Sequence, residues 1–125
     1  MREERKRYEE YKVLLAGTDA EKAFDDDYAF AYVESETTLP DGGIFVSFRT
    51  GYNTDDVVSF VRRGTKVSTR RGRRSNYGGY SCSCDGTTIT EIRNYGFGSK
   101  TIAKFDLDFN EISKRDEISY GCCCN

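Results

Sequence analysis

The sequence predicts an α+β fold in which two short N-terminal helices pack on a small split β-sheet, antiparallel or mixed. Helical spacing of apolar residues is confined to the first 24 residues, and later stretches alternate apolar with polar residues. Turn residues such as Leu39-Pro40-Asp41-Gly42-Gly43 separate the later stretches. A chain of 125 residues suits one core. We therefore expect a single domain over 1–125, with helices in 1–27 and the sheet in 28–125.

The N-terminal region predicts two helices, the first over residues 3–16. Tyr8 and Tyr11 lie three residues apart and share a face with the leucines that follow. Gly17 suits the residue just beyond the helix end. Thr18-Asp19-Ala20-Glu21 matches a capping box and predicts a second, short helix. We expect both helices to dock on the sheet.

Strands are expected wherever β-branched and aromatic residues form short runs. The predicted strands are residues 28–33, 44–49, 80–84, 87–93, 101–109 and 117–120. Residues 110–116 are polar and are expected to form a connection rather than a strand.

Residues 55–63 are ambiguous between a strand and a helix, and we predict a short helix. The three valines of this segment favour a strand. However, Asp55 and Asp56 suit the positive end of a helix, and Arg62 and Arg63 suit its negative end. Gly64 would then end the helix.

Composition excludes several classes of function. The sequence has no histidine, so Ser-His and Cys-His catalysis are excluded. No apolar run is long enough to span a bilayer and no signal-like segment opens the chain, so we expect a cytoplasmic protein that does not bind membranes. Five cysteines without a CxxC pair predict free thiols rather than a metal site. They are Cys82, Cys84, Cys122, Cys123 and Cys124.

The segment 62–74 is strongly basic, although the net charge of the chain is −2. Its cations are followed by Tyr77, and cations beside aromatic residues suit a phosphate backbone with stacked bases. This pattern predicts a non-enzymatic binding or inhibitor protein, of the kind that mobile elements encode, that contacts nucleic acid or a nucleic-acid-handling enzyme. A solvated loop without a ligand is the alternative. The candidate binding residues are Arg62, Arg63, Lys66, Arg70, Arg71, Arg73, Arg74 and Tyr77.

Three short motifs occur in a fixed order along the chain. They are Phe48-Arg49 at the end of a predicted strand, Tyr80-Ser81-Cys82-Ser83, and Glu117-Ile118-Ser119. A second Glu-Ile-Ser, at residues 111–113, is an alternative to the last of these. Together the motifs resemble the Arg/Ser-Thr-Ser/Glu signature of mono-ADP-ribosyltransferases of the cholera- and pertussis-toxin class. Cys82 stands at the threonine position.

The resemblance implies NAD as cofactor and transfer of ADP-ribose to a protein or nucleic acid. Glu117 would be the catalytic residue and would accept a hydrogen bond from the ribose while the nicotinamide bond breaks, as carboxylates do in glycoside cleavage. Arg49 would bind an NAD phosphate or ribose. Ser81 and Ser83 would orient the glutamate, and Tyr77 or Tyr80 would stack on the nicotinamide.

Overall fold

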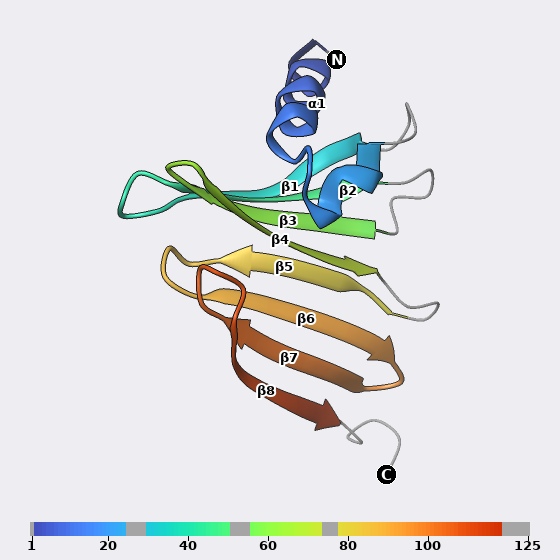
Figure 1. Ribbon diagram of the computed structural model, residues 1–125. Helices are drawn as coiled ribbons and strands as arrows, with labels where there is room; N and C mark the ends of the chain where they lie inside the picture. Colours follow the sequence, from blue (N-terminus) through green and yellow to red (C-terminus); the bar gives the residue numbers. More distant parts are fainter. Residues whose placement is uncertain (1, 25–29, 51–55, 74–77, 119–125) are drawn as a thin grey trace.

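The computed structural model describes residues 2–24, 30–50, 56–73 and 78–118, without the side chains of residues 2–5, 22–24, 30 and 31. This part of the chain is mostly β, with an N-terminal helix and two four-stranded antiparallel sheets (Figure 1). The helices are α1 (Arg2–Leu14) and the 3-10 helix η1 (Asp19–Phe24). The first sheet contains, in order, β1 (Phe30–Thr38), β2 (Ile44–Thr50), β3 (Asp56–Arg63) and β4 (Lys66–Arg73). The second sheet contains, in order, β5 (Tyr80–Cys84), β6 (Ile89–Gly96), β7 (Ser99–Phe105) and β8 (Glu111–Ile118).

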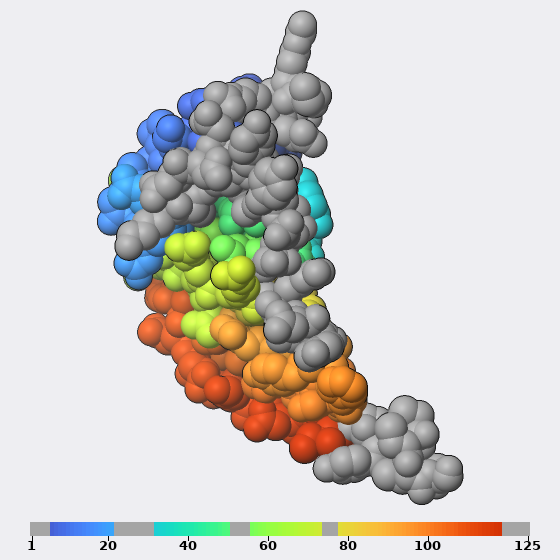
Figure 2. Space-filling view, turned by 90° about the vertical axis from the view of Figure 1, so that its right-hand side faces the viewer, coloured from blue at the N-terminus to red at the C-terminus, as the bar shows by residue number. Residues whose placement is uncertain are grey.

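The first sheet is the middle layer of the molecule, with α1 on one face and the second sheet on the other. Strand β5 contacts β1, β2 and β3, which joins the two sheets. Strand β8 lies at the end of the molecule away from α1 (Figures 1 and 2). The described part of the molecule has a curved outline in Figure 2.

A first core fills the space between α1 and the first sheet. Tyr11 stacks on Phe48 at a centroid distance of 5.5 Å and meets Phe60 edge-on at 5.2 Å. Such aromatic pairs add to the stabilisation that burial itself provides. The buried members of this core are Tyr8, Tyr11, Leu15, Ala20, Val46, Phe48, Val58 and Phe60.

A second core lies between the two sheets. Because neighbouring side chains of a strand point to opposite faces, the alternate residues Phe45, Val57 and Val61 face the second sheet. Strands β2 and β3 therefore contribute to both cores. The buried members of the second core are Leu39, Phe45, Val57, Val61, Tyr80, Cys82, Ile89, Ala103 and Phe105.

Several sequence predictions are confirmed. The first helix is present as α1, and Thr18 accepts a hydrogen bond from the backbone N–H of Ala20 at the start of η1. Strands occur at five of the predicted places, as β1, β2, β5, β6 and β7. The expected antiparallel pairing is also present, but the strands form two sheets and the fold is mostly β.

The helix predicted over residues 55–63 is wrong, since residues 56–63 form strand β3. This strand is buried on both faces, so its apolar residues form a nearly continuous run instead of an alternating one. Asp56 at one end of the strand pairs with Arg71 and Arg73 of β4, and Arg63 at the other end pairs with Asp108 in the β7–β8 connection. Gly64, with φ of 63°, belongs to a two-residue hairpin turn between β3 and β4.

The polar connection predicted over residues 110–116 is also wrong, because strand β8 occupies residues 111–118. Nearly every residue of β8 is exposed, so the strand has no buried face and no apolar alternation. Pairing with β7 forms it instead, through main-chain hydrogen bonds that leave no trace in the sequence.

We predict that Gly72→Ala destabilises the protein by about 1–3 kcal/mol. The ring of Tyr80 packs directly over Gly72, so an added Cβ would lie 2.0 Å from a ring carbon. Urea unfolding measures the change. Gly79→Ala is the control, since an added Cβ there meets no atom within 4 Å. Equal stability of the Gly72→Ala variant and the wild type would contradict this packing.

Candidate functional site

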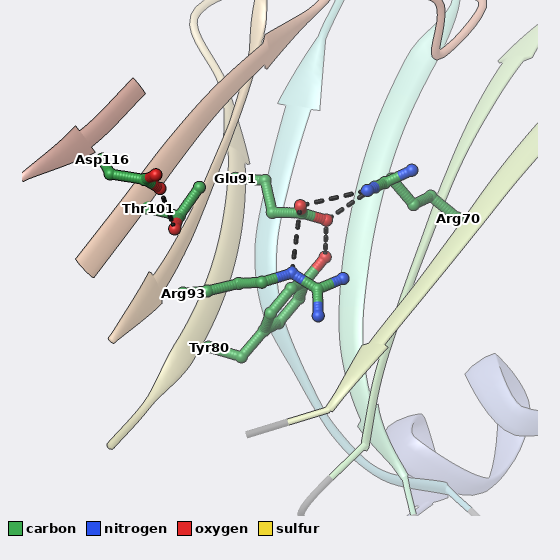
Figure 3. A network of polar contacts seen from close by, with 6 residues as sticks. All are labelled: Arg70, Tyr80, Glu91, Arg93, Thr101 and Asp116. Atoms are coloured by element: carbon green, nitrogen blue, oxygen red, sulfur yellow. Dashed lines mark hydrogen bonds and ion pairs between the residues drawn. The ribbon is translucent and has the colours of Figure 1, made fainter. Parts of the chain in front are cut away.

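A polar cluster lies inside the interface between the two sheets, and we call its members Arg70, Tyr80, Glu91 and Arg93 the Glu91 cluster (Figure 3). The Glu91 carboxylate is 3 % exposed. Arg70 donates to it through Nε at 2.6 Å and Nη2 at 3.1 Å, and Arg93 donates through Nε at 3.3 Å. The Tyr80 hydroxyl donates a further hydrogen bond. Both carboxylate oxygens are therefore saturated by donors from two sheets.

The strand pairings bring these side chains together. Glu91 lies two residues after the buried Ile89 on β6, so both side chains are on the same face, the one that faces the first sheet. Arg70 lies opposite Ser59 and points from β4 toward the second sheet. The Arg70 guanidinium also lies 4.3 Å from the ring centroid of Phe105. Cation–π contact of this kind holds a guanidinium in a partly desolvated position.

The electrostatics of the cluster favour a charged Glu91 and a neutral Tyr80. Burial alone raises the pKa of Glu91, but hydrogen bonds and charge from Arg70, Tyr80 and Arg93 outweigh it and lower the pKa below its ordinary value. Burial raises the pKa of Tyr80. Burial also raises the pKa of the neighbouring Cys82 thiol to about 12, so that thiol is not a nucleophile at neutral pH. The cluster is suited to joining the sheets rather than to moving protons.

Arg49, predicted to bind NAD, lies beside this interface. Its Nη2 donates to the main-chain carbonyl of Tyr80 at 2.8 Å, and its Nε lies 2.9 Å from the Glu34 carboxylate. The structure therefore joins the first two sequence motifs through the Arg49–Tyr80 hydrogen bond. Tyr80 itself, expected to stack on nicotinamide, is 2 % exposed and packed between the sheets.

The side chains of the other predicted site residues do not point toward Arg49. Ser81 and Ser83 alternate with the inward-facing Tyr80 and Cys82, so they point to the outer face of the second sheet. Glu117 lies on β8. Strands β8 and β5 are three strand spacings apart in the sheet, a distance of about 14 Å. Its carboxylate pairs with Arg115 at 2.8 Å and Lys100 at 3.7 Å. Glu111, the alternative glutamate, begins the same strand.

The basic segment forms the β3–β4 hairpin rather than a loop. Arg63 and Lys66 share one carboxylate, Asp108, at 2.6 and 2.9 Å. At the other end of the hairpin, Arg71 and Arg73 share Asp56 at 3.8 and 3.6 Å. Arg70 is occupied by Glu91, and Arg62 is exposed near the hairpin turn. Arg74 and Tyr77 lie outside the described residues.

An open groove of about 690 Å³ lies between α1 and the first sheet. Its apolar part comes from both layers, and charged residues of both signs surround it. Of the residues predicted to form a site, Arg62 lines this groove. The other lining residues are Arg7, Glu9, Glu10, Tyr11, Val13, Leu14, Glu36, Ile44, Val46 and Phe60.

Cysteines and metal ligands add no further site in the part of the chain that the structure describes. Cys82 and Cys84 are free thiols, buried and half-buried. Within the same residues, no three Cys, Asp or Glu side chains are grouped as metal ligands would be. None of the described helices has the length and apolar character needed to cross a membrane. The three remaining cysteines, 122–124, lie outside the described residues.

Comparison with protein-family models, with curated proteins and with solved structures found no match to this chain. The function must therefore be argued from the geometry. Glu91 and Arg93, which sequence reasoning did not single out, are part of that geometry. The available signal was a carboxylate two residues after Ile89, on the same face of a predicted strand as that apolar residue.

We predict that Glu91→Gln destabilises the protein by about 3 kcal/mol at pH 7, because breaking a buried ion pair leaves charge without a partner. The folded-state pKa of Glu91 is lowered, so its contribution is complete above the unfolded value, about 4.3, and is lost as the pH falls through the folded value. The difference from wild type, followed by urea unfolding between pH 7 and pH 2, should close in acid. Glu117→Gln, at an exposed pair, is the control and should stay within about 0.5 kcal/mol. A gap that does not change with pH would contradict an ionised Glu91.

Proposed function

We propose that this protein is a non-enzymatic binding protein whose β3–β4 hairpin contacts nucleic acid. The observation that carries the proposal is the excess of cations over carboxylates at both ends of the hairpin. Asp108 serves two cations, Arg63 and Lys66, and Asp56 serves two others. Among the ion pairs of the described residues, two cations therefore share one carboxylate at each end of the hairpin, although the whole chain carries a net charge of −2.

The cations at the Asp56 end are the better placed for a partner. The Arg73 side chain is 72 % exposed and Arg71 is 37 % exposed, and both ion pairs to Asp56 are long. Exposed ion pairs at such distances contribute little to stability. A phosphate backbone can therefore replace or share the carboxylate without disturbing the fold, and binding releases counterions from the nucleic acid.

Arg70 has a different role from its neighbours in the hairpin. Its two hydrogen bonds to Glu91 and its contact with Phe105 hold it between the sheets. It supports the strand that displays the exposed arginines, and it is not itself available to phosphate. The cations proposed to contact nucleic acid are therefore Arg63 and Lys66 at the turn end of the hairpin and Arg71 and Arg73 at its other end.

We predict that fluorescently labelled single-stranded RNA or DNA binds the protein and that affinity falls steeply with salt. The double variant Arg71→Gln/Arg73→Gln should weaken binding at low salt roughly tenfold or more and reduce the slope of log K against log salt by about 1 to 2. Fluorescence anisotropy over a salt series measures both quantities.

Lys100→Gln/Lys104→Gln is the matched control, since it removes the same charge from the outer face of the second sheet. Thermal unfolding of both double variants should match wild type. The hairpin is not the contact if both double variants lose the same affinity. Absence of binding to either oligonucleotide at low salt would end the proposal.

An NAD-dependent ADP-ribosyltransferase is the second candidate, and the hydrogen bond between Arg49 and the Tyr80 carbonyl favours it. That bond brings together two of the three motifs that resemble the toxin family. The candidate requires Glu117, on β8, to reach the same dinucleotide. Separation of the motifs across the second sheet is the reason we rank it second.

If the second candidate holds, NAD should raise the midpoint of thermal unfolding, because a ligand that binds the folded state stabilises it. Glu117→Ala should then abolish release of nicotinamide, measured by chromatography, while Glu111→Ala leaves it unchanged. Equal rates of NAD cleavage in wild type and Glu117→Ala would remove Glu117 from the mechanism. Absence of a thermal shift at millimolar NAD would remove NAD.

A further inference from the structure

Strand β8 is an open edge of the second sheet. It pairs with β7 on one side, and no described strand pairs with it on the other. It lies at the end of the molecule opposite α1, as Figures 1 and 2 show. Nearly all of its residues are exposed, including Ile112 at 61 % and Ile118 at 57 %. Unpaired main-chain N–H and C=O groups at such an edge can accept another strand.

Symmetry limits how two copies of β8 can pair with each other. A two-fold axis relates two antiparallel edge strands only when it runs perpendicular to the sheet. Rotation about that axis keeps each side chain on its own face, so even-numbered residues meet even-numbered ones. The axis must therefore pass between two copies of one residue, and only a few alignments remain.

The alignment centred on Arg115 is complementary at every even-numbered position. Lys114 lies opposite the partner's Asp116, and Ile112 lies opposite the partner's Ile118. Each of these contacts occurs twice because of the two-fold axis. Opposite charges and apolar pairs directly across an antiparallel ladder are stabilising. Along the even-numbered face the residues are apolar, basic, acidic and apolar. An antiparallel second copy therefore places apolar residues opposite apolar ones and basic residues opposite acidic ones.

Neighbouring alignments are less favourable. Centring on Lys114 places that lysine against itself and Glu111 opposite the partner's Glu117. Centring on Asp116 places two aspartates together and pairs only five residues of each strand. Centring on Ser113 also pairs only five residues. The Arg115 alignment pairs seven.

The one like-charge contact of the favoured alignment is that of Arg115 with its own copy. Within each chain, Nε of Arg115 already lies 2.8 Å from the Glu117 carboxylate. The partner's Glu117 is also the diagonal neighbour of Arg115 in this alignment, within reach of a long side chain. The two guanidinium groups would therefore sit between two carboxylates, which offsets their repulsion.

We propose that β8 pairs with β8 of a second copy, antiparallel and centred on Arg115, so that the two second sheets form one continuous eight-stranded sheet. The partner is this same chain. The contact does not involve the hairpin of the proposed nucleic-acid surface and is independent of that proposal. It does share β8 with Glu117, the glutamate of the enzymatic candidate.

Charge reversal tests the pairing directly. Lys114→Glu should weaken dimerisation roughly tenfold or more, since two attractive contacts become repulsive, and Asp116→Lys should do the same. The double variant Lys114→Glu/Asp116→Lys exchanges the charges and should restore the dimer. Sedimentation equilibrium measures the dissociation constants. Lys104→Glu, the same change on neighbouring β7, is the control and should leave dimerisation intact.

A disulfide tests the alignment itself. Opposed residues of an antiparallel pair lie within disulfide range. Arg115→Cys, with Cys122, Cys123 and Cys124 replaced by serine, should form a symmetric cross-link on mild oxidation, and peptide mass spectrometry identifies it. Lys104→Cys in the same background should not. A wild-type protein that stays monomeric at a concentration of about 100 μM overturns the proposal. So does a double variant whose dimer is as weak as the dimers of the single variants.

Discussion

The shared carboxylate of Glu91 is the interaction on which the rest of this structure depends. A buried carboxylate is tolerated only when its oxygens are fully hydrogen-bonded. Here the donors come from both sheets, Arg70 from the first and Tyr80 and Arg93 from the second. The apolar residues of the second core drive the sheets together, but they do not specify one relative position. Hydrogen-bond geometry around Glu91 does, because a carboxylate and a guanidinium fork match in only a few arrangements.

Sequence reasoning found the elements whose burial is one-sided. The helix α1 shows helical spacing because only one of its faces meets the sheet, and β5 and β7 alternate for the analogous reason. Strand β3 was mistaken for a helix because it is buried on both faces. All of β8 except its last two residues was predicted as a connection, because the strand is exposed on both faces. Where the two faces of a strand have the same surroundings, the period-2 pattern disappears.

The candidate site was less predictable than the fold. Arg70 was identified as one of a group of cations, but nothing in the sequence separated it from Arg71. The separation follows from strand geometry, since neighbouring residues point to opposite faces, one into the sheet interface and the other to solvent. Glu91 could have been suspected from its apolar neighbours, whereas its partners, 11 and 21 residues away in sequence, required the tertiary structure.

Buried and exposed charges have different roles in this molecule. Arg70, Glu91 and Arg93 use their charges inside the molecule, so they set its shape without meeting a partner. The exposed arginines of the hairpin and the charges of β8 carry little of the stability and are available for recognition. The proposed surfaces lie at separate places, one on the first sheet and one at the far edge of the second (Figure 1).

The two apolar faces of β3 have a consequence for how its register with β4 is chosen. Since valines and phenylalanine occupy both faces of β3, hydrophobicity alone gives little penalty against a one-residue slip. A slip in one direction would put Thr69 in place of Arg70 and leave Glu91 without its main cation. A slip in the opposite direction would place Arg71 beside Glu91 and so keep a guanidinium at that position. It would also put Arg73 in the place of Gly72, where the ring of Tyr80 leaves no room for a side chain. Arg70 and Gly72, two residues apart on β4, therefore fix the register of this hairpin.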